Sequence, residues 1–202
     1  PDYPSVHQHP HEAAKELDRL TSEGKIFWYP EGERPDNLDI GPTALILKSD
    51  RARLVHDWTR AGLNAHLSAP PTQFAGMGDF LSTIHPGCYM AGLDIKDCFY
   101  HWAIHESARR RLGVRHPITG RYGVYLFLPP GLSAAPGYNE QFVHQMVLAA
   151  QKNLGIPVAR FVDDLRITSQ TRLAPANDEA LLHTKLLCFK RNLEELGMRV
   201  HT

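Results

Sequence analysis

The spacing of apolar residues along the chain predicts three helices. The first covers residues 11–23 and ends at Gly24, and the second covers residues 135–154, with Pro136 in its first turn. The third covers residues 177–196. Its apolar side chains recur at spacings of three and four residues, at Leu182, Leu186, Phe189, Leu193 and Leu196.

Shorter apolar runs predict β-strands between these helices. They cover residues 43–48, 53–56, 88–95, 121–128, 156–162 and 165–168. Residues 49–51 are expected to join the first two strands as a hairpin, and Asp163 and Asp164 to form the tip of a hairpin between the last two. Strands interleaved with helices that pack on one side of a sheet indicate an α+β layer fold.

Composition narrows the classes of function. The 202 residues suffice for one large domain or two joined subdomains, and 22 basic residues balance 22 acidic ones. A nucleic-acid-binding surface would therefore need local clustering of basic residues, or segments outside this chain. Three scattered cysteines argue against a disulfide framework and favour an intracellular protein (cytoplasm, nucleus or virus-like particle) over a secreted one. No apolar run predicts a membrane span, and both ends suggest a cut from a longer polyprotein.

Three acidic residues carry the candidate chemistry. Asp94 ends one apolar strand, and Asp163 and Asp164 lie between two others. Carboxylates at strand ends can converge outside a sheet edge, and hard oxygen ligands are what Mg²⁺ prefers. Two such ions support in-line phosphoryl displacement. An acidic pair in a turn is, on its own, explained by the preference of Asp for turns, so the apolar context of all three residues decides the interpretation.

Several blocks of the sequence resemble, in order, those of reverse transcriptases. Residues 93–99 are similar to the first palm motif, in which an Asp is followed five residues later by an aromatic residue. Residues 128–136 resemble the Leu-Pro-x-Gly motif in its retrotransposon form, and residues 161–164 resemble the aromatic-x-Asp-Asp motif. The resemblance spans roughly residues 10–202 and also includes two basic fingers segments and a helix with a following glycine, at 47–50, 53–57 and 193–198.

The resemblance implies a site for two Mg²⁺ ions, for which Mn²⁺ can substitute. Asp94 and Asp163 would be the bridging ligands, with Asp164 alongside them, and the carbonyl of Ile95 would bind the nucleotide-side ion. The implied activity is RNA-directed DNA synthesis on a primed RNA or DNA template, with deoxynucleoside triphosphates as substrates.

Further residues are implied in nucleotide binding. Lys48 and Arg53 would hold the triphosphate, and Arg suits this role because its planar guanidinium bonds phosphate oxygens bidentately. Backbone amides near Asp97 and Cys98 would add anion contacts.

The remaining implied contacts concern the sugar and the base. Phe99 would lie under the sugar and exclude a 2′-hydroxyl, although a core position is the ordinary role of a Phe. Pro130 and Gly131 would shape the wall near the base. Pro130 replaces the Gln or Phe common in the family, and Arg166 stands where the family usually has an apolar or small residue.

The implied architecture is a right-hand polymerase without its thumb. Residues 1–69 and 102–134 would form the fingers, and residues 70–101 and 135–202 a palm made of an antiparallel sheet backed by helices. A thumb and an RNase H domain would belong to the longer polyprotein. Two alternatives stay open: a domesticated or truncated module that serves as a nucleic-acid-binding or structural component, and an RNA-templated RNA polymerase, against which Phe99 argues.

Overall fold

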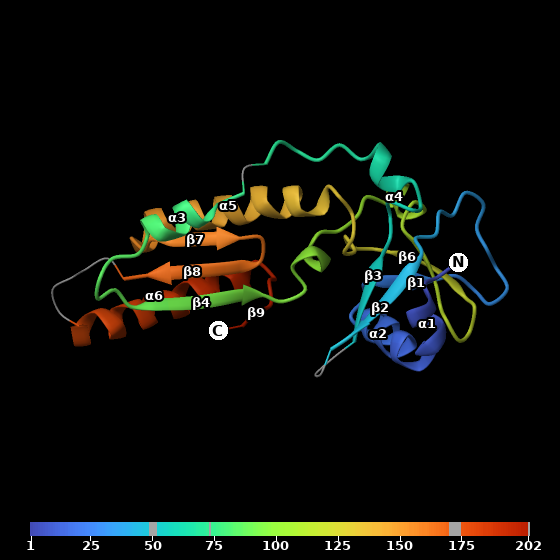
Figure 1. Cartoon of the computed structure of the whole chain (residues 1–202), viewed down its shortest axis with the longest axis horizontal. Coiled ribbons are helices and arrows are strands. Elements are labelled where there is room, and N and C mark those ends of the chain that lie inside the picture. Colours follow the sequence, from blue (N-terminus) through green and yellow to red (C-terminus); the bar gives the residue numbers. More distant parts are fainter. Residues whose placement is uncertain (49–51, 73, 170–174, 202) are drawn as a thin grey trace. The chain divides into compact units, whose positions relative to one another are not determined.

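A computed structural model describes residues 1–48, 52–72, 74–169 and 175–201 (Figure 1). Contacts divide the chain into two units, each built from two separate segments. The first unit comprises Pro1–Ala69 and Phe99–Ala135, and the second comprises Pro70–Cys98 and Pro136–Thr202. The sequence predicts the same boundary after residue 69, and later boundaries after residues 101 and 134 rather than 98 and 135.

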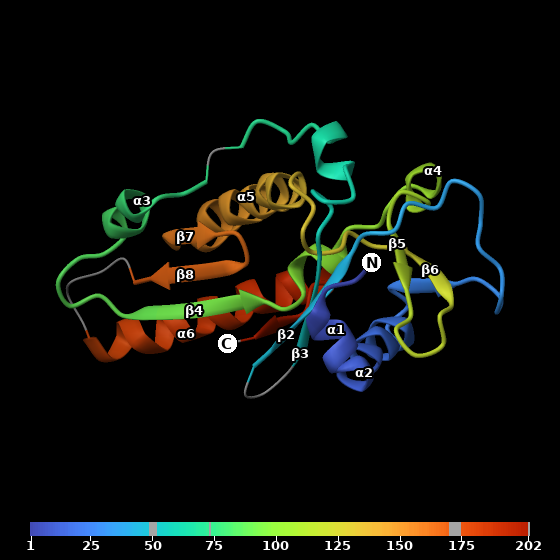
Figure 2. The same ribbon diagram turned by 45° about the vertical axis from the view of Figure 1, so that its right-hand side comes forward.

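The first unit combines short helices with two small antiparallel sheets. Its elements are α1 (Pro4–Gln8), α2 (Pro10–Ser22), β1 (Ile26–Trp28), β2 (Thr43–Leu47), β3 (Ala52–His56), η1 (Leu63–His66), α4 (Glu106–Arg109), β5 (Gly113–Arg115) and β6 (Tyr122–Tyr125). One sheet has the strand order β1-β6-β5, and the other pairs β2 with β3 (Figure 2). A single turn, η2 (Cys98–His101), begins at the last residue of the other unit's first segment.

The core of the first unit forms where the apolar face of α2 meets the sheets. Leu17 and Leu20 are buried in one cluster with Leu54 of β3, Trp58 and Tyr125 of β6. The helical spacing of Leu17 and Leu20 puts both on the side that packs inward, so α2 is stabilised mainly by burial of this face.

The second unit is a four-stranded antiparallel sheet with helices. Its elements are α3 (Met77–Ser82), β4 (Met90–Ile95), α5 (Ala135–Leu154), β7 (Val158–Phe161), β8 (Asp164–Thr168), α6 (Pro175–Glu195) and β9 (Val200–His201). The strand order is β7-β8-β4-β9. The first two strands of this order form a hairpin, and β4 pairs with both β8 and β9, so β4 is a central strand.

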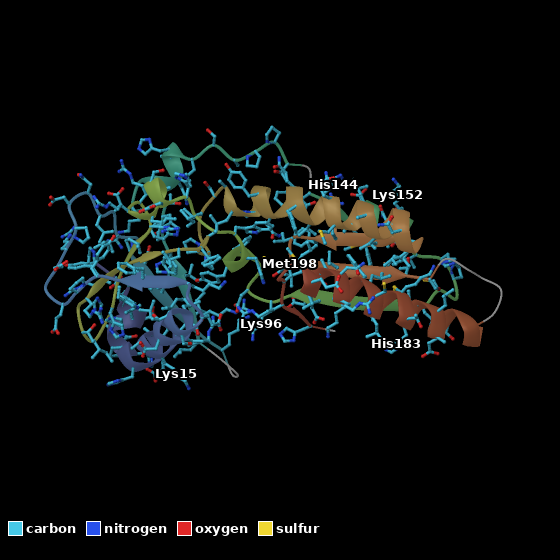
Figure 3. All side chains as sticks on the ribbon, turned by 180° about the vertical axis from the view of Figure 1, so that it is seen from behind. Lys15, Lys96, His144, Lys152, His183 and Met198 are labelled. Atoms are coloured by element: carbon cyan, nitrogen blue, oxygen red, sulfur yellow. The ribbon has the colours of Figure 1, made fainter. Side chains whose placement is uncertain are left out.

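The two faces of this sheet differ in chemistry. Leu93, Leu165 and Ile167 are each at most 1% exposed and lie on one face of the sheet. Helices α5 and α6 cover this face, as the front view of Figure 1 and the back view of Figure 3 show. Asp94 and Arg166 lie at alternate positions on the other face and are exposed, and Asp164 on the same face is half-buried. The alternation therefore presents the acidic residues to solvent while the apolar residues build the core.

The α+β class is confirmed, and several elements agree closely with the sequence prediction. Helix α5 has the predicted bounds, and α2 and α6 differ from theirs by one or two residues at each end. The predicted turn at 49–51 lies outside the described residues. Residues 68–88, which gave no clear pattern, contain α3. None of the described helices is both long and apolar enough to cross a membrane.

Candidate active site

Asp94 and Asp164 lie directly opposite each other on neighbouring strands. They are Cα partners in the antiparallel pairing of β4 with β8, so both side chains project from the same exposed face. The Ile95 amide donates to the carbonyl of Asp163 at 3.0 Å. Because hydrogen-bonded and non-hydrogen-bonded pairs alternate, the Asp94–Asp164 pair is of the non-hydrogen-bonded kind, in which the side chains lie closer.

Asp163 lies in the tight turn between β7 and β8. Phe161 pairs with Asp164, so Val162 and Asp163 form a two-residue loop. Val162 has a φ of +58°, and a β-branched residue in this left-handed region is strained. This turn confirms the predicted hairpin, with Asp163 next to Asp164 in the chain at its tip.

A buried amide from α5 holds the strained turn. The Asn139 side chain is 0% exposed, and its Nδ2 donates to the Val162 carbonyl at 2.9 Å. The next residue, Glu140, is 2% exposed, and its Oε1 accepts from Nε of Arg160 in β7 at 2.6 Å. Two consecutive side chains of α5 therefore fix the strand and the turn that carry Asp163.

Arg166 lies on the same exposed face as the acidic pair. Its Nη2 donates to Oδ2 of Asp164 at 2.9 Å, and the side chains are 49% and 43% exposed, respectively. The guanidinium covers Gly92, the cross-strand partner of Arg166: a Cβ on Gly92 would lie 1.9 Å from Nη1. The absence of a side chain at Gly92 thus makes room for the arginine next to Asp164.

Two of the three carboxylates, those of Asp94 and Asp164, suit a Mg²⁺ ion that takes its other ligands from water and substrate. Within the described ranges, no group of three or more His, Cys, Asp or Glu side chains could hold a metal ion as arranged. Mg²⁺ commonly uses one or two carboxylates and completes its octahedron with water and substrate phosphates. Asp94 and Asp164 lie on one face and could serve as such a pair. Asp164 would first have to lose its hydrogen bond with Arg166.

The segment after β4 is also held in a specific conformation. Asp97 adopts a φ of +52°, and its Oδ2 accepts from Nη2 of Arg199 at 3.0 Å. The Lys96 amide donates to the Arg199 carbonyl at 2.9 Å, and Cys98 is buried. Arg199 therefore fixes the turn that contains two of the residues expected to contact the triphosphate.

The other expected nucleotide-binding residues belong to the first unit. Lys48 directly follows β2 and Arg53 lies in β3, and both side chains are exposed. Phe99 is partly buried and packs against the hydrophobic cluster of that unit, which agrees with an ordinary core role. The structure thus gathers the acids and the Asp97–Cys98 turn in one unit, and Lys48, Arg53, Phe99, Pro130 and Gly131 in the other.

Gly131 is required by close packing in the first unit. It has a φ of +97°, and a Cβ at this position would lie 2.2 Å from the carbonyl oxygen of His56. Nε1 of Trp58 donates to the Pro130 carbonyl at 3.2 Å, and Nδ2 of Asn64 donates to the Gly131 carbonyl at 3.1 Å. The segment is therefore fixed against the end of β3, which carries Arg53.

Sequence reasoning missed the residues that support the site. Asn139 and Glu140 are polar residues within a helix that is otherwise buried on this side, and buried polar side chains in such a place need specific partners. That signal could have singled them out, but it could not have named Val162 or Arg160 as the partners.

Comparison with known proteins adds no relative. No protein-family model matches the chain, and a search of curated proteins gives no significant match.

Proposed function

We propose that this chain is the fingers and palm module of an RNA-directed DNA polymerase. The observation that carries the proposal is the register of β4 and β8, which puts Asp94 opposite Asp164 on an exposed sheet face, with Asp163 in the adjoining turn. Carboxylates from separate strands on one open face suit phosphoryl transfer to a large polymeric substrate. The first unit corresponds to the proposed fingers and the second to the proposed palm.

In this proposal, residues of the second unit position the reacting groups and stabilise the negative charge on the phosphates. When bound, magnesium ions would activate the primer 3′-hydroxyl and neutralise charge on the α-phosphate and the departing pyrophosphate. Asp94, Asp163 and Asp164 would supply the carboxylates that hold these ions, and the carbonyl of Ile95 would add a further oxygen. The strained turn at Val162 sets the direction of Asp163, so positioning rather than covalent chemistry accounts for the rate enhancement.

The nucleotide-binding roles remain those implied by the resemblance. Lys48 and Arg53 are exposed cations of the first unit, and their proposed role is to bind triphosphate oxygens. The backbone amides near Asp97 and Cys98 are the proposed anion contacts of the second unit. Phe99 lies under the deoxyribose.

Pro130 and Gly131 form the wall near the base. The partners are a primed RNA or DNA template, and a thumb and an RNase H domain on a longer polyprotein. The proposed setting is intracellular.

The test is magnesium-dependent extension of a labelled DNA primer on an RNA template. The wild-type chain is expected to add deoxynucleotides, and Asp163→Asn to abolish addition while leaving the circular dichroism spectrum unchanged. Glu194→Gln, an exposed carboxylate on α6, is the matched control and should extend normally. Normal extension by Asp163→Asn would refute the assignment.

A second experiment addresses the sugar. Phe99→Ala should admit ribonucleotides into the extended primer, because the ring no longer occupies the space of a 2′-hydroxyl. Unchanged discrimination between ribo- and deoxynucleotides would remove Phe99 from this role. Efficient ribonucleotide addition by the wild type would instead favour an RNA polymerase.

A binding module without catalysis is the second candidate. It is favoured by the ion pair that engages Asp164 with Arg166 and by the equal numbers of acidic and basic residues. Such a module would bind primed template without extending it under any divalent cation. Extension by the wild type that is lost in Asp163→Asn excludes this candidate.

A further inference from the structure

The exposed face of the second unit's sheet carries two adjacent cross-strand pairs with opposite chemistry. Asp94 lies opposite Asp164, and two residues along each strand Gly92 lies opposite Arg166. Two residues of a strand span about 6.7 Å, so the guanidinium lies one step along the sheet from the carboxylate pair. If the carboxylate pair holds metal ions, the Arg166 side chain can reach the part of a bound substrate that lies on this side of them.

The contact between Arg166 and Asp164 is readily exchanged. Both side chains are substantially exposed, with 49% and 43% of their areas accessible, and exposed ion pairs contribute little to stability. A single hydrogen bond joins them, from Nη2, although a guanidinium carries five N–H donors. When a divalent cation takes Asp164, the guanidinium is released beside the site with its donors available for another anion.

Strand polarity indicates which anion this is. Along β4, the Asp97–Cys98 turn that is proposed to contact the triphosphate follows Asp94, whereas Gly92 precedes it. Arg166 therefore lies on the opposite side of the carboxylate pair from the triphosphate contacts. The substrate on that side of the reacting centre is the strand that ends in the attacking hydroxyl.

The surface around Arg166 suits the sugars and bases of such a strand. A pocket of about 380 Å³ beside the guanidinium is lined by α3 and by the hairpin, including Met77, Phe80 and Phe161. Phe161 is 63% exposed and pairs with Asp164 on the same face. Exposed aromatic rings beside a cation are typical of surfaces that bind nucleic-acid strands without reading their sequence.

We propose that Arg166 binds a backbone phosphate of the primer strand next to its 3′ end. This inference rests on the proposed polymerase function and deepens it, because it assigns a primer-positioning residue where the family that the sequence resembles usually has an apolar or small residue. Gly92 is part of the same device, since a side chain there would displace the guanidinium.

The test measures binding of the full chain to a fluorescent primer–template in Mg²⁺ without nucleotides, across a series of salt concentrations. Arg166→Ala is expected to raise Kd roughly tenfold and to lower the slope of log Kd against log salt by about 0.9, the value for one lost phosphate contact. Arg166→Lys should recover part of the affinity, and Gly92→Ala should weaken binding to an intermediate degree. Arg191→Ala, an exposed arginine on α6, is the matched control and should change neither quantity.

A chemical substitution in the primer locates the contact. A neutral methylphosphonate at the last internucleotide linkage should weaken binding by the wild type about as much as Arg166→Ala does, on the order of tenfold. The two changes together should weaken binding no further, because they remove the same contact.

Two outcomes would overturn the inference. One is an Arg166→Ala protein whose Kd and salt slope are unchanged, even if it needs less Mg²⁺ for activity. Arg166 would then be only a counterion of Asp164. The other is full additivity of the protein and primer changes. A wild-type chain that shows the predicted binding but extends no primer would instead refute the polymerase function and leave the phosphate contact standing.

Discussion

Asp94 and Asp164 are paired across two strands with their carboxylates on the same side of the sheet. Like charges placed directly opposite each other destabilise a sheet, so this arrangement lowers the stability of the second unit unless a cation relieves it. Arg166 relieves it from the next cross-strand pair by its hydrogen bond to Asp164. In the proposed function, Asp164 would exchange this contact with Arg166 for a contact with a metal ion.

Asp94→Asn should therefore stabilise the protein while it abolishes activity. Removal of one of two opposed charges is expected to raise the free energy of unfolding of the second unit by about 0.5 kcal/mol. Amide hydrogen exchange of β4 and β8 without divalent cations measures this change. The control Glu194→Gln should leave the hydrogen-exchange rates of both strands unchanged. A sheet that is less stable in Asp94→Asn than in the wild type would show that the two charges do not repel each other.

Asn139 should contribute to both stability and catalysis. Asn139→Ala leaves the Val162 carbonyl without its donor and removes a fully buried amide, which is expected to cost about 1–3 kcal/mol of stability. Primer extension should fall more than stability alone explains, because Asp163 loses its fixed direction. Gln141→Ala, an exposed change in the same helix, should alter neither property by more than about 0.5 kcal/mol. Extension by a folded Asn139→Ala protein at the wild-type rate would remove Asn139 from the site.

His56 makes the first unit sensitive to acid. It is 2% exposed, its Nε2 lies 2.6 Å from the Tyr125 hydroxyl, and its Nδ1 lies 3.1 Å from the Thr43 hydroxyl. Burial lowers the pKa of His56 from 6.5 to about 4, and a backbone hydrogen bond with Gly41 opposes this shift only in part. The folded unit therefore holds this imidazole neutral at pH values where the unfolded chain protonates it.

The stability of the first unit should consequently fall between pH 6.5 and 4. The unfolded chain takes up a proton below pH 6.5 and the folded unit only near pH 4, so stability is complete above the higher value. The loss across this range is roughly 3 kcal/mol. All three tryptophans lie in the first unit, so their fluorescence in urea titrations reports this unit. His56→Gln should flatten the pH dependence of the free energy of unfolding, whereas the exposed control His11→Gln should not. Equal pH dependence in the wild type and both variants would show that His56 is not the group responsible.

Gly131 offers a test of the packing that positions the Pro130 segment. Gly131→Ala should destabilise the first unit by more than roughly 2 kcal/mol. The new Cβ would clash with the His56 carbonyl, and alanine would have to adopt an unfavourable positive φ. Gly62→Ala shares the positive φ but has open space around its Cβ, so it should cost only about 1 kcal/mol. The difference between the two urea midpoints isolates the close contact, and equal losses would show that His56 moves away at little cost.

Elements with a long local pattern could be predicted from the sequence. The bounds of α5 and the pairing of the two strands around Asp163 follow from periodicity and from a short polar tip between apolar runs. By contrast, β1 and β5 have three residues each, and β1 exists because Ile26 pairs with Tyr125 far along the chain. Such strands depend on tertiary pairing and leave too little local signal.

The sequence singles out Asp94 and Asp164, which the structure places opposite each other, but it does not single out the residues that hold the turn beside them. Asp94 and Asp164 stand out because carboxylates interrupt apolar strands. The contact of Asn139 with Val162 spans 23 positions, and the positive φ of Val162 contradicts the ordinary preference of valine. Strain that is stabilised by a distant buried side chain is a property of the folded unit, so no local pattern contains it.

Cleavage of the backbone by bound Fe²⁺ tests the central claim most directly. Fe²⁺ that replaces Mg²⁺ reduces added hydrogen peroxide to hydroxide and hydroxyl radicals, and the radicals cut the chain near the metal. If the two strands share a metal site, cuts should occur both in β4 around Asp94 and in the turn around Asp163. Excess Mg²⁺ should protect both segments, and both sets of cuts should be lost in Asp94→Asn. Cuts at the turn that persist in Asp94→Asn, or no cuts at either segment in the wild type, would contradict a metal site shared by the two strands.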